Sequence, residues 1–400
     1  MFLRPILLAI GIFTIAAGFA YYTSSHPMDF RVYHYGARGV FDGTRPVYGA
    51  ASGLGWPMHY RYPPLFLLLF APLAALPLGW GAAIWVTLKI IVFVVLLRVR
   101  LCRLQPAGAR SPSWSFCIVF LFITPYLVEE FRYGNAQFFV VALTAASLLV
   151  ARERPVLSAA SLALAVSVKV WPVFFVPYLV VRRDWQVVAY TLGFVVFLTL
   201  LPSFYFGFHD NLNLLGQWFS QESQTQLGSR EIWFPNQSLR GVLMRYLTVI
   251  DYSQVPDSNY QQIHIAELDP ELVRALWIVV AAAVYIAFLV FAGRRRHTDG
   301  RLEHGLAFCL LALLEPFTQK YALAVLLWPA LISGSFMAIR YVRLFMYIAA
   351  ALALIQPLTP GSAAQRLFQV LGLDFAAALL LTLAILAACW KSSNDDALPA

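Results

Sequence analysis

Apolar runs of about twenty residues recur along this chain, and residues 4–23, 80–99 and 271–292 are clear examples. A helix of about 20 apolar residues is long enough to cross the hydrocarbon core of a bilayer. Hydrophobic residues make up 60% of the 400 residues and charged residues only 12%, which excludes a soluble globular protein. The sequence therefore predicts an all-α integral membrane protein. We expect one polytopic domain, residues 1–400, with about twelve transmembrane helices and no separate soluble domain.

Short clusters of Arg separate these runs and predict which loops lie inside the cell. Cytoplasmic loops carry an excess of Lys and Arg, so Arg98 and Arg100 mark one inner loop and residues 294–296 mark another. The same bias accounts for the net charge of +9 without a nucleic-acid partner. It places both chain ends inside, with residues 24–79 as the first outer loop and residues 203–270 as a long outer loop.

Two apolar segments are not predicted to be single membrane-crossing helices. Residues 64–77 are bounded by proline, and a crossing there would place the Arg98 cluster outside, so we expect a helix at the outer interface. Residues 155–181 are flanked by basic residues on both sides. We expect them to form two short arms with Lys169 at an outer tip.

Ionisable and amide side chains gather in the predicted outer corners, and Asp29 lies a few residues after the first apolar run. A carboxylate can take a proton from an attacking hydroxyl while Arg or Lys holds a departing phosphate. This combination suits transfer of a group from a lipid-linked phosphate, with Asp29 as the general base. The candidate phosphate-binding cations are Arg61, Arg132, Lys169, Arg240 and Lys320.

Structural roles are also open for these residues. Asp29 could cap the short helix that follows it, because Asp is a preferred N-cap residue. Glu129 and Glu130 could be solvated surface charges, with Arg132 paired to either. Lys169 could extend its side chain to the outer headgroups.

Aromatic residues in the same corners offer flat apolar faces with polar tips for a sugar. Tyr33, Tyr62 and Trp171 are candidates, and anchoring at the membrane interface is the alternative role for each. His34 and His59 are isolated from other metal ligands, so no metal site is predicted and no cofactor is expected.

Several short motifs follow one another in a fixed order. They are Asp29-Phe30-x-x-Tyr33, Gly43 with Tyr48, Tyr62-Pro63-Pro64, Tyr133-Gly134-Asn135-Ala136-Gln137, Val168-Lys169-Val170-Trp171-Pro172, and Asn236-Gln237-Ser238-Leu239 with Arg245. In this order they resemble the polyprenol-phosphate-dependent sugar transferases of glycosyltransferase family 87, a family of GT-C-type membrane enzymes. The resemblance covers about residues 26–330.

The resemblance implies a fold, a reaction and residue roles. Family members are similar to mannosyltransferases that take a sugar from a polyprenyl-phosphate donor outside the membrane and invert its anomeric carbon. Asp29 would be the general base, Lys169 or Arg132 would lie near the phosphate, and the Gly-Asn-x-Gln and Lys-x-x-Pro corners would line the donor pocket. The residues assigned to the sugar or acceptor site are Tyr33, His34, Tyr62, Asn135, Gln137, Trp171, Asn236, Gln237, Glu315 and Gln319.

One departure from the family leaves the sugar and the acceptor open. Better-known members carry a histidine-containing stretch where this chain has Glu315, Thr318, Gln319 and Lys320. Mannose is the favoured sugar, and arabinose is an alternative.

We therefore predict a metal-independent membrane glycosyltransferase in the cytoplasmic membrane, with its active site on the outer face. Its expected partners are the lipid bilayer, a polyprenyl-phosphate-linked sugar donor and a glycolipid or glycan acceptor. A multi-helix transporter or lipid flippase is the alternative, although transporters usually place polar groups near the membrane midplane in repeated halves. A non-catalytic scaffold is a second alternative, and it would tolerate loss of the Asp29 carboxylate.

Overall fold

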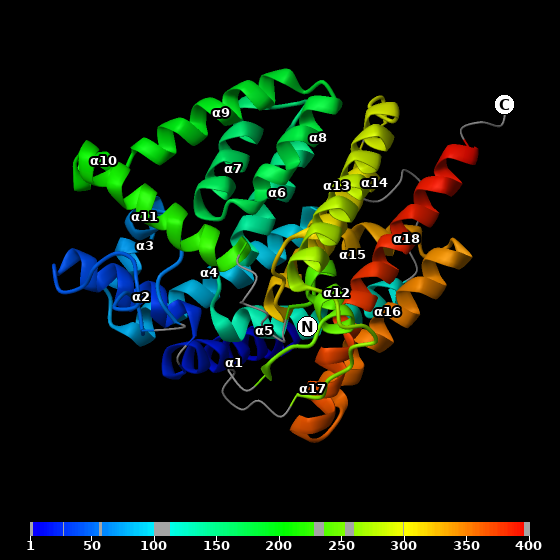
Figure 1. Ribbon diagram of the computed structural model, residues 1–400, viewed down its shortest axis with the longest axis horizontal. Helices are drawn as coiled ribbons and strands as arrows, with labels where there is room; N and C mark the ends of the chain where they lie inside the picture. Colours follow the sequence, from blue (N-terminus) through cyan, green and yellow to red (C-terminus); the bar gives the residue numbers. More distant parts are fainter. Residues whose placement is uncertain are drawn as a thin grey trace. The chain divides into compact units, whose positions relative to one another are not determined.

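The computed structural model describes residues 3–26, 28–55, 58–99, 113–227, 236–252, 260–298 and 300–395. Within these ranges the chain forms helices and connecting loops and no β-strand, which confirms the predicted all-α class (Figure 1). Arg100, which we predicted to mark an inner loop, lies outside the described residues.

The chain divides into two compact units. The first unit comprises Met1–Arg98, Val128–Pro172 and Gln186–Thr225. The second unit comprises Val99–Leu127, Val173–Trp185 and Gln226–Ala400. The polar residues that the sequence singles out therefore fall into two separate groups, one in each unit.

Six helical segments of the described residues are long and apolar enough to cross a membrane. They are Leu78–Val99, Trp114–Tyr133, Trp185–Phe206, Pro270–Arg294, Arg340–Leu358 and Leu373–Ser392. They support a multi-pass membrane protein. A further group of shorter apolar helices in these ranges has 10–17 residues, and a helix of 14 residues rises about 21 Å, less than the ~30 Å hydrocarbon core. The count of about twelve crossings therefore stays a prediction.

The first unit holds the helices around the predicted first outer loop. Its helices are α1 (Leu3–Ser25), α2 (Asp29–Phe41), α3 (Pro64–Ala74), α4 (Leu78–Val99), the end of α5 (Ser113–Tyr133), α6 (Gln137–Val150), α7 (Pro155–Val168), α9 (Trp185–Leu200), α10 (Ser203–Phe206) and α11 (Phe208–Leu227). The helices predicted at 4–23, 64–77 and 80–99 are present. The segment predicted as a long loop from residue 203 instead begins with two helices.

The second unit holds the start of α5 and most of the C-terminal half. Its other elements are α8 (Phe175–Val181), α12 (Leu239–Leu247), α13 (Pro270–Arg294), α14 (Arg301–Leu314), η4 (Lys320–Leu326), α15 (Leu327–Ser333), η5 (Gly334–Phe336), α16 (Arg340–Leu358), α17 (Ser362–Leu371) and α18 (Leu373–Asp395). The Asp269 carboxylate caps α13 by accepting the Glu271 N–H at 2.8 Å, and Pro270 follows at the first helical position. The helix predicted at 271–292 is confirmed.

An aromatic core fixes α2 in the first unit. Phe30 and Tyr33 lie one turn apart on α2, and Phe66 and Phe70 lie one turn apart on α3, so each pair faces the other helix. The Tyr33 ring meets the Phe66 ring edge-on at 5.1 Å and the Phe70 ring at 5.6 Å. All four side chains are buried. Because this face is packed, the first residue of α2, Asp29, is held in a defined position.

The helix break predicted around Lys169 is confirmed. α7 ends at Val168, Lys169 has an extended backbone (φ −139°, ψ 130°), and the short helix η2 (Trp171–Phe174) follows. α7 belongs to the first unit and α8 to the second, so the antiparallel hairpin of the two arms stays a prediction.

Candidate active site

Asp29 is the first residue of α2, but it does not cap that helix. Met28 occupies the N-cap position, and no side chain makes a capping hydrogen bond there, so the capping role is wrong. Asp29 is half-buried, and its Oδ2 accepts a hydrogen bond from Asn135 Nδ2 at 2.7 Å. Among the described residues, Asn135 is the one hydrogen-bond donor to this carboxylate. An oxygen of Asp29 therefore remains able to accept a proton from another molecule.

Asn135 connects this carboxylate to a lysine. Its Oδ1 accepts hydrogen bonds from the backbone N–H of Gln137 at 2.8 Å, from Lys169 Nζ at 3.0 Å and from the Tyr62 hydroxyl at 3.3 Å. A backbone N–H can only donate, so this bond fixes which end of the Asn135 amide faces Asp29. Asn135 thus holds the acid on one side and the cation on the other.

Gln137 and three aromatic residues complete the cluster. Gln137 Oε1 accepts from Lys169 Nζ at 2.9 Å and from Trp171 Nε1 at 3.1 Å. The Tyr62 hydroxyl lies 2.6 Å from the Tyr33 hydroxyl, and Lys169 Nζ lies 5.6 Å from the centre of the Tyr62 ring. Seven residues that the sequence assigned to the site therefore lie together. We call them the Asp29 network: Asp29, Tyr33, Tyr62, Asn135, Gln137, Lys169 and Trp171.

Gly134 allows the chain to approach α2 closely enough for this network to form. It has a positive φ of 65°, and a Cβ atom there would lie 2.6 Å from side-chain carbons of Phe30 and Thr23. Both features favour glycine. The Gly134 carbonyl accepts a hydrogen bond from Trp85 Nε1 at 2.8 Å. The turn that presents Asn135 is therefore fixed from both sides.

A buried ion pair supports the same turn. Lys89 Nζ lies 2.7 Å from Glu130 Oε2, and both side chains are fully buried. Glu130 Oε1 also accepts the backbone N–H of Phe138 at 3.0 Å, at the start of α6. The prediction of Glu130 as a solvated charge is therefore wrong. A lysine within the apolar run 80–99 was the sequence signal that could have revealed a buried partner.

Burial raises the pKa of Asp29 above its ordinary value. The hydrogen bond from Asn135 and the positive charges of Lys169 and Arg61 oppose part of this rise. A carboxylate with a raised pKa is a stronger base when it is ionised, which suits removal of a proton from a hydroxyl group.

The other two predicted cations of the first unit are paired with glutamates. Arg61 Nε and a terminal nitrogen bind both oxygens of Glu222 on α11, at 3.0 and 3.1 Å. Arg132 binds Glu129 at 2.8 Å and the Tyr22 hydroxyl at 2.5 Å. Glu222 was not predicted, because residues 203–270 were assigned to a loop rather than a helix.

His34 contributes to the fold. Its Nε2 donates to the Leu76 carbonyl at 2.9 Å, between α3 and α4, and its ring is buried beside Phe30. Burial lowers the pKa of His34. The structure thus places His34 against backbone outside the Asp29 network.

The remaining predicted residues lie in the second unit, where Asn236 and Gln237 bind mainly backbone. Asn236 Oδ1 accepts the N–H of Ser238 and of Thr318, both at 3.0 Å, and its Nδ2 donates to the Pro316 carbonyl at 2.9 Å. The backbone N–H of Gln237 donates to the Thr318 carbonyl at 2.6 Å. We call these five residues, 236–238, 316 and 318, the Asn236 corner.

Four further predicted residues surround this corner or lie near it in the chain. Glu315 accepts a hydrogen bond from the Thr318 hydroxyl at 2.9 Å, and Gln319 precedes η4. Lys320 donates to Gln356 at 2.6 Å. The Arg240 guanidinium lies 5.6 Å from the centre of the Trp277 ring.

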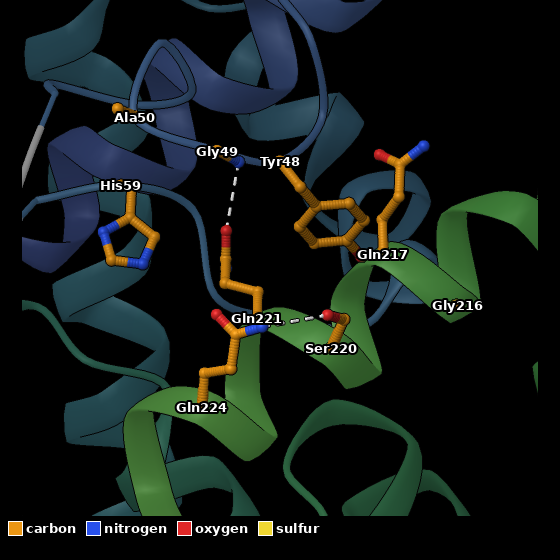
Figure 2. A pocket seen from close by; sticks show the side chains of 9 residues that line it. All are labelled: Tyr48, Gly49, Ala50, His59, Gly216, Gln217, Ser220, Gln221 and Gln224. Carbon is orange, nitrogen blue, oxygen red and sulfur yellow. Dashed lines mark hydrogen bonds between the residues drawn. The ribbon is translucent and has the colours of Figure 1, made fainter. Parts of the chain in front are cut away.

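A cavity of about 640 Å³ lies in the first unit between the first loop and α11 (Figure 2). Tyr48, Gly49 and His59 line it from the loop, and Gln217, Ser220 and Gln221 line it from α11. The sequence analysis did not anticipate it, although the four-residue spacing of Leu214 and Trp218, which pack against the core, is a helical signal.

Comparison with known proteins agrees with these motifs. The chain matches the model of glycosyltransferase family 87 over residues 60–316, more than half of its length, and it belongs to that family. The resemblance inferred from the sequence is confirmed. The match begins after Asp29, so the role of Asp29 rests on the geometry of its network.

Three similar proteins are mycobacterial. Polyprenol-phosphate-mannose-dependent alpha-(1-2)-phosphatidylinositol mannoside mannosyltransferases of Mycobacterium tuberculosis and Mycolicibacterium smegmatis are each 26% identical, over 190 and 237 residues. The alignments cover 44% and 54% of this chain and 44% and 52% of those proteins. A Mycolicibacterium smegmatis enzyme named for phosphatidylinositol pentamannoside is 30% identical over 193 residues, 47% of this chain and 46% of its own. The chain thus spans about half the length of these curated relatives.

Proposed function

We propose that this protein is a membrane glycosyltransferase that moves a sugar from a polyprenyl-phosphate donor to a hydroxyl group of a glycolipid or glycan acceptor. Family membership supports the class of enzyme. The names of the relatives support the donor, and they make mannose the first sugar to test. The apolar helices and the Arg-rich inner loops support a reaction at the outer face of the cytoplasmic membrane.

One observation carries the proposed mechanism: a half-buried carboxylate and a lysine bind opposite ends of the same Asn135 amide. In the proposed step, Asp29 takes the proton of the acceptor hydroxyl, and the acceptor oxygen bonds to the anomeric carbon. The bond from that carbon to the phosphate oxygen breaks, and polyprenyl phosphate departs with the electron pair. A single displacement of this kind inverts the anomeric carbon. No metal ion takes part in this proposal.

We propose Lys169 as the first candidate to stabilise the negative charge that develops on the phosphate. Its ammonium donates to two neutral amide oxygens, whereas Arg61 and Arg132 each bind a glutamate. Arg61 adds positive charge near Asp29 and is the second candidate. Arg240 and Lys320 belong to the second unit and are left out of the proposed step.

The first test is sugar transfer by the purified protein in nanodiscs. Radiolabelled polyprenyl-phosphate mannose is supplied with a crude lipid extract, and a nucleotide-linked mannose serves as the control donor. We expect a labelled lipid product from the polyprenyl donor alone. Transfer from the nucleotide donor, or equal transfer by an Asp29→Asn variant, would contradict the proposal.

A further inference from the structure

α11 presents two different faces in the first unit. Leu214 and Trp218, one turn apart, pack against the core, and Trp218 Nε1 donates to the Arg61 carbonyl at 3.1 Å. Glu222, one further turn along, holds the Arg61 side chain. The neighbouring face carries Gln217, Ser220 and Gln224, which are exposed. The first face anchors the helix, so the second face is held in a fixed position.

The polar face of α11 forms one wall of the cavity (Figure 2). Gln221 braces the two walls: its Oε1 accepts the Gly49 N–H at 3.0 Å, and its Nε2 donates to the Tyr60 carbonyl at 2.9 Å. The Tyr48 ring and the Gln217 amide both line the space (Figure 2). The cavity is therefore a built feature with an aromatic ring, hydroxyl and amide groups on its walls.

The chemistry of this lining selects a class of ligand. None of the residues that line the cavity is Asp, Glu, Lys or Arg. A phosphate group would need a cation, and Ala50 is the one aliphatic side chain that the lining offers to a prenyl or acyl chain. Amide and hydroxyl groups can bind sugar hydroxyls, and a tyrosine ring can cover the apolar face of a sugar. The volume of about 640 Å³ lies within the range of small-molecule sites.

We propose that this cavity binds the glycan part of the acceptor, a neutral carbohydrate, while the reacting hydroxyl lies at Asp29. This inference rests on the proposed function. Tyr48 connects the two places, because its hydroxyl donates to the Tyr62 carbonyl at 2.9 Å and the Tyr62 hydroxyl reaches Asn135 at 3.3 Å. In this proposal the distant sugars are bound equally before and during the reaction, so loss of this uniform binding raises KM more than it lowers kcat.

The test uses the full chain in nanodiscs with a Gln217→Ala/Gln224→Ala variant. The matched control is Asn213→Ala, which removes an exposed amide of α11 that does not line the cavity. Binding of neutral mannotriose is measured by saturation-transfer NMR in a background of Asp29→Asn, so this readout does not depend on catalysis. Each lost neutral hydrogen bond weakens binding by up to about tenfold. We expect weaker mannotriose binding and a raised acceptor KM in the double variant alone, with equal thermal unfolding.

The outcomes separate this inference from the proposed function. Mannotriose binding that is lost in the double variant supports the cavity as a carbohydrate site even if the natural protein transfers no sugar. Mannotriose that does not bind, or that binds equally to the double variant, overturns the inference, and so does an unchanged KM in an active enzyme. Displacement of mannotriose by inorganic phosphate would also overturn it, because the site would then bind an anion.

Discussion

Asn135 and Asn236 adopt the same local arrangement in different units. Each side-chain oxygen accepts the backbone N–H of the residue two positions on, at 2.8 Å in the first case and 3.0 Å in the second, just before or at the start of a helix. Their other bonds differ. Asn135 binds the side chains of Asp29, Lys169 and Tyr62, whereas Asn236 binds the backbone of residues 316 and 318. One motif thus organises side chains for chemistry, and the other joins chain segments.

The cations of the two regions differ in the same way. Lys169 is half-buried and donates to side-chain amides. Arg245 beside the Asn236 corner is fully buried, and its N–H groups donate to the carbonyls of Asn236 at 2.6 Å and Val370 at 2.8 Å. Burial lowers the pKa of Arg245 to about 10. A cation that holds backbone carbonyls stabilises the fold, whereas one at a half-exposed amide cluster can meet a substrate.

Asp29→Asn, in the Asp29 network, is expected to lower activity more than any change at the Asn236 corner. Asparagine keeps the shape of the side chain and can still accept the Asn135 N–H, but it cannot take a proton. General base catalysis contributes about 10² to 10⁴ in rate, so we expect kcat to fall by that factor. The measurement is single-turnover transfer in nanodiscs, with Asp42→Asn, an exposed carboxylate directly after the same helix, as control.

The stability of the Asp29→Asn variant provides a second readout. Because the pKa of Asp29 is raised in the folded protein, its ionised form destabilises the fold at pH values above that pKa. Asparagine does not ionise, so the variant should unfold at an equal or higher temperature at neutral pH. This difference should shrink as the pH falls through the raised pKa. A variant that unfolds earlier at neutral pH would make Asp29 a structural residue.

Much of the fold could be predicted from the sequence, because apolar runs define helices directly. α1, α4 and α13 lie close to their predicted ranges. α11 was missed because Gln, Ser and Asn dominate its sequence, and that composition resembles a loop. Its helical signal is limited to a few apolar residues such as Leu214 and Trp218. Only the structure shows that these two side chains pack against the aromatic core.

The members of the Asp29 network could be predicted individually but their bonding could not. Asp29, Asn135 and Lys169 are far apart in sequence, and only the close approach at Gly134 brings them into one cluster. The same kind of motif predicted Asn236 as a site residue alongside Asn135, because sequence cannot reveal whether an amide binds side chains or backbone.

Lys169→Met is expected to have the second largest effect. Methionine keeps the length of the side chain but removes the charge proposed to stabilise the departing phosphate. Loss of one such group costs about 10² to 10³ in rate, so kcat should fall by that factor while Lys169→Arg retains part of it. The exposed Arg38→Met on α2 is the control for loss of a positive charge. Unchanged kcat in Lys169→Met would transfer the phosphate role to Arg61.

A matched pair of alanine variants tests whether Asn135 and Asn236 have different roles. Asn236→Ala leaves the buried N–H groups of Ser238 and Thr318 without their present acceptor, at about 1–3 kcal/mol for each buried group. We expect a lower unfolding temperature and a near-normal kcat per folded molecule. For Asn135→Ala we expect the opposite balance, with a large fall in kcat and a small fall in unfolding temperature. The measurements are thermal unfolding and active-site-normalised transfer on the same preparations, and identical profiles for the two variants would refute the distinction.

Arg132→Gln is expected to have the smallest effect, and it tests whether position in an outer corner is enough to make a cation catalytic. Arg132 binds Glu129 one turn earlier on α5 and the Tyr22 hydroxyl on α1, so its bonds join two helices. Partly exposed ion pairs contribute about 0–1 kcal/mol, so unfolding should shift only slightly and kcat should stay close to that of the unchanged protein. A fall in kcat comparable to that of Lys169→Met would place Arg132 at the phosphate, and the half-exposed pair with Glu129 would then have to open when the donor binds.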